Sequence, residues 1–270
     1  MFAPFLTNTW ITASVVAVVA GLVGFFVVLR GSSFLAHALP HGAFAGAAGA
    51  TLLGIDPILG MGVFAVGGAI AVSTLGRRGR SDVVIALSLV LMLAFGALFL
   101  SLGTEYSSEV FALLFGQILG VSTVEVGPIV LLGVVCVVAI IVAYRRLLLS
   151  SVLPDIAAAR GISEFRMSLF FALVVAVATA MSVPIVGALL LFSLLVGPPA
   201  AARSFTSNPL RAIPLSIGFA LLTVWVSIAA AYYSSLPVGF FVTLGSAILY
   251  GLGRGWFVLR ARRTRVAVGA

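Results

Sequence analysis

The chain contains no lysine, because all 15 basic residues among its 270 are arginine. A P-loop needs the lysine of its GxxxxGK[ST] motif to bind phosphate, so the chain cannot hydrolyse ATP by that mechanism. Cys136 is the only cysteine, which excludes intrachain disulfides and cysteine-based metal clusters. Histidine is almost as scarce, since His37 and His41 are the only two.

Charged residues are also rare. They make up 8% of the chain, whereas hydrophobic residues make up 62%, and the mean hydropathy is +1.29. This composition excludes a soluble globular domain, in which about 25% of residues are charged. The sequence predicts a single all-α transmembrane domain over residues 1–270, a multi-pass protein of the cell inner (cytoplasmic) membrane. The net charge of +8 comes from loop arginines and does not indicate nucleic-acid binding.

Nine apolar segments, each near the ~20 residues that cross the hydrocarbon core, are separated by polar, glycine or proline breaks. Arginines fall only in alternate connections and in the tail, so the positive-inside rule places the N-terminus outside and the basic tail 254–270 in the cytoplasm. If the second segment re-enters the membrane without crossing it, eight spans remain and the N-terminus is inside. The segments lie near residues 9–29, 34–53, 57–75, 83–102, 123–143, 165–182, 184–202, 210–233 and 237–256.

The second segment carries both histidines. His37 and His41 are four residues apart, so a helix presents both imidazoles on one face, about one turn apart. Neutral imidazole is a ligand favoured by zinc, copper, iron and nickel, and an ionisable residue at membrane depth is a functional candidate by default. The pair is therefore a candidate metal site. The alternative is a pair of hydrogen-bonded packing residues.

Small residues and prolines shape this segment and two others. Glycines at positions 42, 46 and 49 predict a surface that lets neighbouring helices approach closely. Pro40 lacks an amide hydrogen, so a helix through it would kink there or begin there. Pro184 predicts an outer reversal of the chain, and the pair Pro198-Pro199 predicts the end of a helix.

The predicted outer connection between residues 103 and 125 contains Glu105 and Glu109 and no arginine. These carboxylates would attract cations or a partner toward the outer face, but ordinary solvation of surface carboxylates is the stronger explanation.

The predicted cytoplasmic connection between residues 150 and 166 is the longest polar interval on that side. Pro154 and Asp155 near its start and Gly161 near its end are helix start and stop signals, which predict a short helix near 154–161. This helix has too little apolar surface to span the membrane. An exposed helix of this kind suits docking by a cytoplasmic partner, and a simple connector is the alternative.

Six stretches, in their order and spacing, resemble those of the membrane permeases of metal-type ABC importers. The resemblance covers most of the chain and implies a type II ABC-importer-like fold and a family role in zinc or manganese uptake. It also implies three partners: a cytoplasmic ABC ATPase subunit that binds ATP, an extracytoplasmic metal-binding protein and a second copy of the chain. The stretches are VVLRGSSFLAHALPHGAFAG (27–46), GIDPILG (54–60), LLFGQILGVS (113–122), LPDIAAARGIS (153–163), GALLLFSLLVGPPAAAR (187–203) and LPVGFFVTLG (236–245).

The same resemblance implies a role for the predicted short helix, which looks like the coupling helix that fits a groove on the ATPase subunit. Pro154, Asp155, Ala158 and Gly161 would be its coupling residues. Zinc or manganese would be cargo, and no permanently bound cofactor is implied.

Family members usually carry an aspartate, and four residues later a histidine, in the second segment, where both are implicated in metal passage. Here His37 stands at the aspartate position and His41 at the histidine position. Two nitrogen ligands without a carboxylate favour zinc over manganese. The family's proline-alanine-alanine signature is also altered, because Pro199 follows Pro198.

Two functions of other classes compete with this one. In a stand-alone ion-coupled carrier or channel, Glu105, Glu109 and the histidines would relay protons or cations. A non-transporting membrane scaffold would fit the small-residue packing but would leave the histidine pair without a role.

Overall fold

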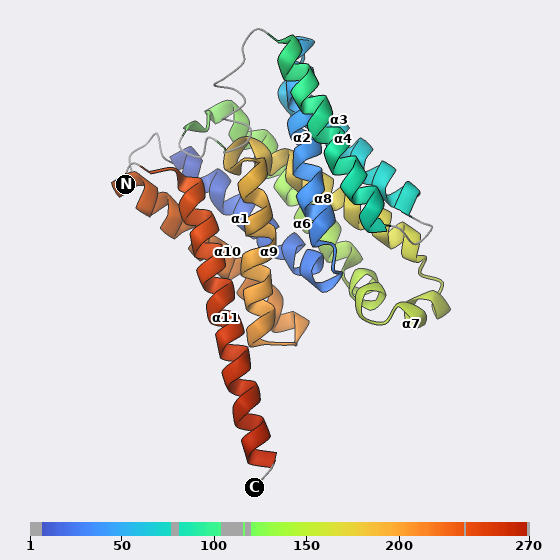
Figure 1. The fold of residues 1–270 in the computed structure, drawn as a ribbon, viewed down its shortest axis with the longest axis vertical. Coiled ribbons are helices and arrows are strands. Elements are labelled where there is room, and N and C mark those ends of the chain that lie inside the picture. Colours follow the sequence, from blue (N-terminus) through green and yellow to red (C-terminus); the bar gives the residue numbers. More distant parts are fainter. Residues whose placement is uncertain (1–6, 77–80, 104–115, 117–119, 235, 269–270) are drawn as a thin grey trace.

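The computed structural model of the chain describes residues 7–76, 81–103, 116, 120–234 and 236–268, and within them the regular structure is entirely helical (Figure 1). The all-α prediction is therefore confirmed. In chain order the helices are α1 (Thr7–Leu29), α2 (Ser33–Leu52), α3 (Pro57–Leu75), α4 (Ser81–Leu102), α6 (Thr123–Val152), α7 (Pro154–Ala159), α8 (Glu164–Val186), α9 (Ala188–Phe205), α10 (Pro209–Ser234) and α11 (Val238–Val268).

The predicted membrane segments each coincide with one helix. Within the described part of the chain, seven helices are long and apolar enough to cross a membrane, namely α1, α3, α4, α6, α8, α10 and α11. The histidine helix α2 runs unbroken for 20 residues through Pro40, a length of about 30 Å at 1.5 Å per residue. Neither α2 nor α9 is among these seven, so the choice between eight and nine spans stays a prediction. The chain is thus a multi-pass membrane protein.

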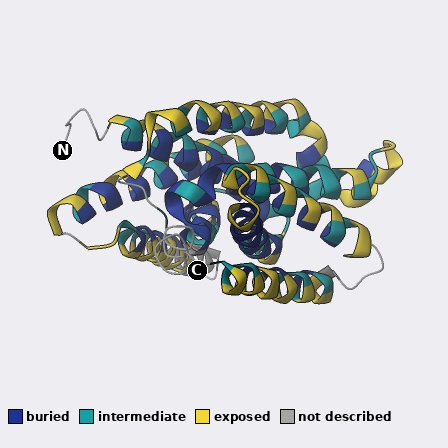
Figure 2. Cartoon of the chain, turned by 90° about the horizontal axis from the view of Figure 1, so that it is seen from above, coloured by how far each residue is buried: buried dark blue, intermediate teal, exposed yellow. Residues whose placement is uncertain are grey.

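Helices α1 and α8 form the centre of the bundle. In each, 72% of the apolar stretch is buried inside the molecule, compared with 17% in α4 and α11. Around this centre α2 packs with α3 and α4, while α9 packs with α10 and α11. Figure 2 shows the buried residues gathered in the interior and the exposed ones on the outer helix faces. Those outer faces carry many exposed leucines and valines, as a lipid-facing surface requires.

The glycines of α2 allow its close packing, as predicted. Gly42 and Gly49 face the side chains of Met92 and Phe99 on α4, while Gly46 faces the backbone of Gly60 on α3. A Cβ atom on Gly46 would overlap the carbonyl oxygen of Gly60. No flexible side chain can move aside there, because the contact is with backbone.

Replacing Gly46 with alanine is expected to destabilise the bundle by about 1–3 kcal/mol through overpacking. Gly62→Ala on α3 is the matched control, because nothing lies within 4 Å of a Cβ built at that position. Thermal unfolding of both purified variants in detergent measures the difference. The packing argument fails if Gly46→Ala unfolds at the same temperature as Gly62→Ala.

The prediction that Pro184 marks the outer reversal is wrong. Helix α8 continues through Pro184 to Val186. The break comes instead at Gly187, whose φ of 85° lies in the left-handed region that favours glycine, and α9 begins at the next residue.

The prediction that Pro198-Pro199 ends a helix is also wrong, because α9 passes through both prolines and ends at Phe205. Both prolines are buried among neighbouring helices. The carbonyl of Leu195, to which Pro199 cannot donate a hydrogen bond, packs against Gly24 of α1. Membrane helices tolerate proline where neighbouring helices surround the freed backbone groups.

The basic tail does not form a separate segment. Helix α11 continues for 31 residues from Val238 to Val268, so the predicted last span and most of the tail are one helix. Figure 1 shows its C-terminal end standing clear of the other helices.

The orientation of the bundle stays a prediction from the arginines, and thiol labelling tests it. The parent chain should not react with thiol reagents, because Cys136 is only 1% exposed. A membrane-impermeant maleimide is expected to label Ile55→Cys, in the α2–α3 connection, on intact cells. It should label Ser207→Cys, in the exposed α9–α10 connection, only after the membrane is opened. The opposite labelling pattern would overturn the predicted orientation.

Candidate functional site

Helix α2 brings the two histidine rings together. The ring centroids of His37 and His41 are 5.0 Å apart, with the ring planes at 82°. His41 is buried, at 6% exposure, and His37 is half-buried. The prediction that one helix face presents both imidazoles is therefore confirmed.

Each ring has a nitrogen without a hydrogen-bond partner. The Nδ1 atoms of both histidines are buried and bond to no atom of the described residues. Leaving a buried polar atom unpaired is costly, and buried polar groups are nearly always paired. The described residues thus leave both nitrogens unpaired, and a metal ion would use the lone pair of a neutral imidazole.

The ring of His37 also contacts Phe192 of α9, with the centroids 4.8 Å apart. This contact ties the histidine pair to a helix that follows it by about 150 positions. The sequence did not reveal it, because nothing in the apolar segment of α9 distinguishes Phe192 from its neighbours.

The histidine pair does not by itself make up a complete set of metal ligands. Among the residues that the structure describes, no cluster of three or more histidine, cysteine, aspartate or glutamate side chains is placed to hold a metal ion. The histidine pair alone provides two of the four ligands of a tetrahedral zinc site. Glu105 and Glu109, the candidate outer cation-attracting residues, lie outside the described residues.

The predicted short cytoplasmic helix is present as α7. Pro154 is its first residue and Asp155 lies in its first turn, where a negative charge complements the helix dipole. The helix ends as predicted, since Gly161 has a φ of 75°. The amide of Ile162 then donates back to the carbonyl of Ala157 at 2.9 Å, the hydrogen bond of a glycine-terminated helix end.

Almost all of α7 faces outward. Pro154, Asp155 and Ala158 are exposed, as is Gly161 beyond the helix. Only Ala157 is buried, at 2% exposure, so this one side chain fastens α7 to the bundle. The helix therefore offers a small, mostly exposed surface between the ends of α6 and α8.

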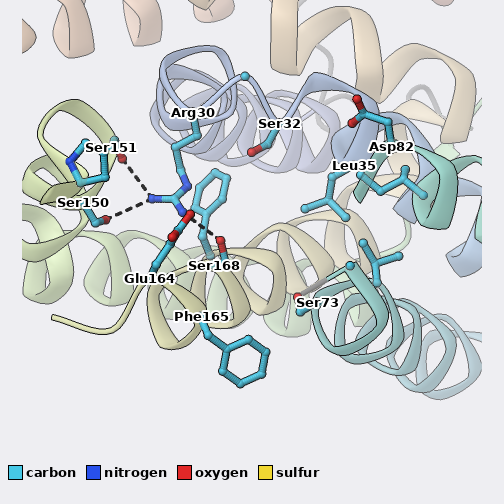
Figure 3. Close-up of a pocket in the computed structure, with 16 residues that line it drawn as sticks. Arg30, Ser32, Leu35, Ser73, Asp82, Ser150, Ser151, Glu164, Phe165 and Ser168 are labelled. Atoms are coloured by element: carbon cyan, nitrogen blue, oxygen red, sulfur yellow. Dashed lines mark hydrogen bonds between the residues drawn. The ribbon is translucent and has the colours of Figure 1, made fainter. Parts of the chain in front are cut away.

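A polar cavity of about 610 Å³ lies beside α7 (Figure 3). Arg30, in the α1–α2 connection, reaches into it and donates hydrogen bonds to the hydroxyl oxygens of Ser150, Ser151 and Ser168. In the sequence, Arg30 is one of the arginines that predict the orientation of the spans, and no other role is assigned to it. Its partners lie 120 to 138 positions away along the chain, so no local pattern could identify them.

Three similarities to known proteins identify the family. Residues 2–253 match the family described as "ABC 3 transport family". The chain is 30% identical over 258 residues to "Manganese import system permease protein ScaB" of Streptococcus pneumoniae, covering 91% of this chain and 88% of that protein. It is 24% identical over 248 residues to "Manganese transport system membrane protein MntC" of Listeria monocytogenes, covering 91% and 88%.

The fold is similar to a solved structure as well. That structure is "PsaBC from Streptococcus pneumoniae in complex with Fab", with a TM-score of 0.84 and 26% identity, covering 93% of this chain and 91% of the solved one. The chain therefore belongs to the ABC 3 transport family and is a multi-pass membrane permease of the metal-type ABC class, as its motifs predict.

Proposed function

We propose that this chain is the permease subunit of an ATP-driven importer of divalent metal ions, and that it transports zinc in preference to manganese. The histidine pair carries the proposal, because two rings 5.0 Å apart each hold a buried, unpartnered nitrogen. Imidazole nitrogen suits zinc, whereas manganese prefers carboxylate oxygen. Two of the relatives are named as manganese permeases, so the metal is to be tested directly.

Two copies of the chain would work together in this transporter. One chain supplies two imidazoles, and two copies would supply four, enough for a tetrahedral site if the pairs meet at the dimer axis. Affinity would remain modest, since a fully closed four-ligand site would retain the ion instead of passing it on.

Energy and cargo would come from separate subunits. The chain has no lysine and hence no P-loop, so a cytoplasmic ATPase subunit would bind and hydrolyse ATP. The exposed helix α7 supports this assignment, because its outward residues are free to fit a partner. An extracytoplasmic metal-binding protein would deliver the ion to the outer face.

Reconstitution in lipid vesicles tests this function. With the metal-binding protein supplied outside, vesicles containing the permease and its ATPase are expected to accumulate zinc only when ATP is present on the ATPase side. Vesicles containing the permease alone should accumulate none, even under an imposed proton gradient. Gradient-driven uptake without the ATPase would instead establish the stand-alone carrier.

Metal choice gives a sharper test through His37→Asp. This variant adds a hard oxygen ligand and keeps His41, so we expect transport to persist while the ratio of zinc to manganese uptake falls roughly tenfold, a change of about 1.4 kcal/mol in relative affinity. His37→Asn is the matched control, with a similar volume and no charge, and it is expected to lose uptake, so that transport retained by His37→Asp is due to the carboxylate. Competition between the two metals in the same vesicles measures the ratio, and an unchanged ratio in His37→Asp would count against a ligand role for this position.

A further inference from the structure

We propose that Arg30 is the positioning residue through which movement of α7 reaches the histidine helix α2. The inference rests on the proposed function and adds a physical link within it, between the surface offered to the ATPase and the metal pair. Contacts, charge and the shape of the cavity support the link.

The contacts of Arg30 join both helices that flank α7. Its Nη1 atom donates to the hydroxyls of Ser150 and Ser151, at 3.2 and 3.1 Å, near the C-terminal end of α6. Its Nη2 atom donates to the hydroxyl of Ser168, at 3.2 Å, in the first turns of α8. Figure 3 shows the guanidinium between the two helices. Any tilt of α7 that shifts α6 against α8 must therefore strain or release these bonds.

The surroundings of Arg30 hold its half-buried charge in place. Its guanidinium carbon lies 5.5 Å from the centroid of the Phe171 ring, a distance at which cation–π attraction acts. Burial lowers the pKa of Arg30, and the charge of Glu164, the first residue of α8, opposes that shift. Arginine stays protonated in proteins, so the three hydroxyls, the ring and Glu164 together compensate a half-buried cation.

The backbone after Arg30 leads directly into α2. The amide of Ser32 donates to the carbonyl of Val27 at 2.9 Å, which closes a tight turn at the end of α1, and the amide of Ala36 donates to the carbonyl of Ser32 at 3.1 Å. His37 is the next residue after Ala36 on the same unbroken helix. A displacement of Arg30 is thus carried to the histidine pair by a short, hydrogen-bonded path.

The cavity explains why this path needs a long side chain. Pro154 of α7 and Leu35 of α2 line the same cavity of about 610 Å³, so packed side chains do not fill the space between the two helices there. The Arg30 side chain extends into that space (Figure 3). Its rigid, multi-donor guanidinium can bond to two helices at once, which a single ammonium group does less well.

The test measures metal ions taken up per ATP hydrolysed, in vesicles that contain the permease with its ATPase. We expect Arg30→Gln and Ser168→Ala each to lower this ratio by about tenfold, within the usual range of coupling between sites, while ATP hydrolysis continues. The double variant Arg30→Gln/Ser168→Ala should be no worse than Arg30→Gln alone, because both remove the same interaction. Arg203→Gln is the matched control, since this nearby exposed arginine donates only to the Val28 carbonyl in the bonds described.

Parental uptake per ATP in Arg30→Gln and Ser168→Ala would overturn the proposal, and so would simple addition of their effects. If Arg30→Gln does not fold, the single variant Ser168→Ala and the double variant Ser150→Ala/Ser151→Ala are used in its place. Each of these substitutions removes only a hydroxyl. Failure of the parent to take up metal with ATP would refute the proposed function itself. Normal uptake by the parent and by these serine variants would refute only the role of Arg30.

Discussion

Alanine in place of His41 is expected to abolish metal uptake, by about 100-fold or more, while the protein remains in the membrane. Removal of residues that merely support a metal ligand already costs 10- to 100-fold, and His41 would be a ligand itself. In the proposed dimer the substitution removes two of the four imidazoles, which leaves too few ligands for an ion that has left its hydration shell. His37→Ala should have the same effect, because the two rings lie together on one helix face. Uptake of zinc by vesicles, normalised to permease content by immunoblot, measures the loss.

His41→Asn separates ligation from packing in this experiment. Asparagine is polar and similar in shape to part of the imidazole, so it would preserve a packing role at this buried position. A metal ligand, in contrast, would be lost with the ring nitrogen. If the double variant His37→Ala/His41→Ala transports zinc as well as the parent does, the pair is a packing feature and the proposed metal site is refuted.

Deletion of Ala157–Ala159 from α7 is expected to uncouple transport from ATP hydrolysis. The deletion removes half of the six-residue helix and its one buried anchor, Ala157, without touching a membrane span. Asp155→Ala should produce a milder loss, because it alters one exposed side chain. Both variants should insert normally; ATP-dependent uptake should be lost in the deletion and reduced in Asp155→Ala, while the ATPase subunit still hydrolyses ATP.

A change in the α9–α10 connection, which is also predicted to be cytoplasmic, serves as the control for α7. Ser207→Ala also alters an exposed residue, on a connection to which no coupling role is assigned, and should leave uptake unchanged. Normal ATP-dependent uptake by the α7 deletion would show that α7 is only a connector. Loss of the deletion variant from the membrane would leave Asp155→Ala to decide.

The membrane helices and the histidine pair were predictable because their signals are local. Hydropathy runs located the helices, since a membrane span must be apolar over its own length whatever its neighbours are. The spacing of His37 and His41 fixed their common face, because helix geometry depends only on sequence separation. The ends of α7 followed from Pro154 and Gly161, which act on their own backbone.

The features that sequence could not supply are all set by tertiary contacts. The effect of Pro198 and Pro199 depends on what surrounds the helical turn in which their backbone N–H groups are missing. Here the neighbouring helices pack around that turn, and α9 stays helical. The contact of Phe192 with His37 and the bonds of Arg30 to three serines join distant parts of the chain. No single-sequence pattern identifies which of many apolar or polar residues will meet in the fold.

Helix α11 is long enough to extend beyond the membrane and to hold its C-terminal end away from the membrane surface. Its 31 residues correspond to about 46 Å of helix, whereas the hydrocarbon core is ~30 Å thick. Under the predicted orientation, roughly ten residues of stiff helix stand off from the inner membrane surface. A fluorescent reporter fused beyond Val268 would therefore be held away from the other helices. It should leave α7 accessible to the ATPase, and its distance from the bilayer should reflect the length of helix outside the membrane.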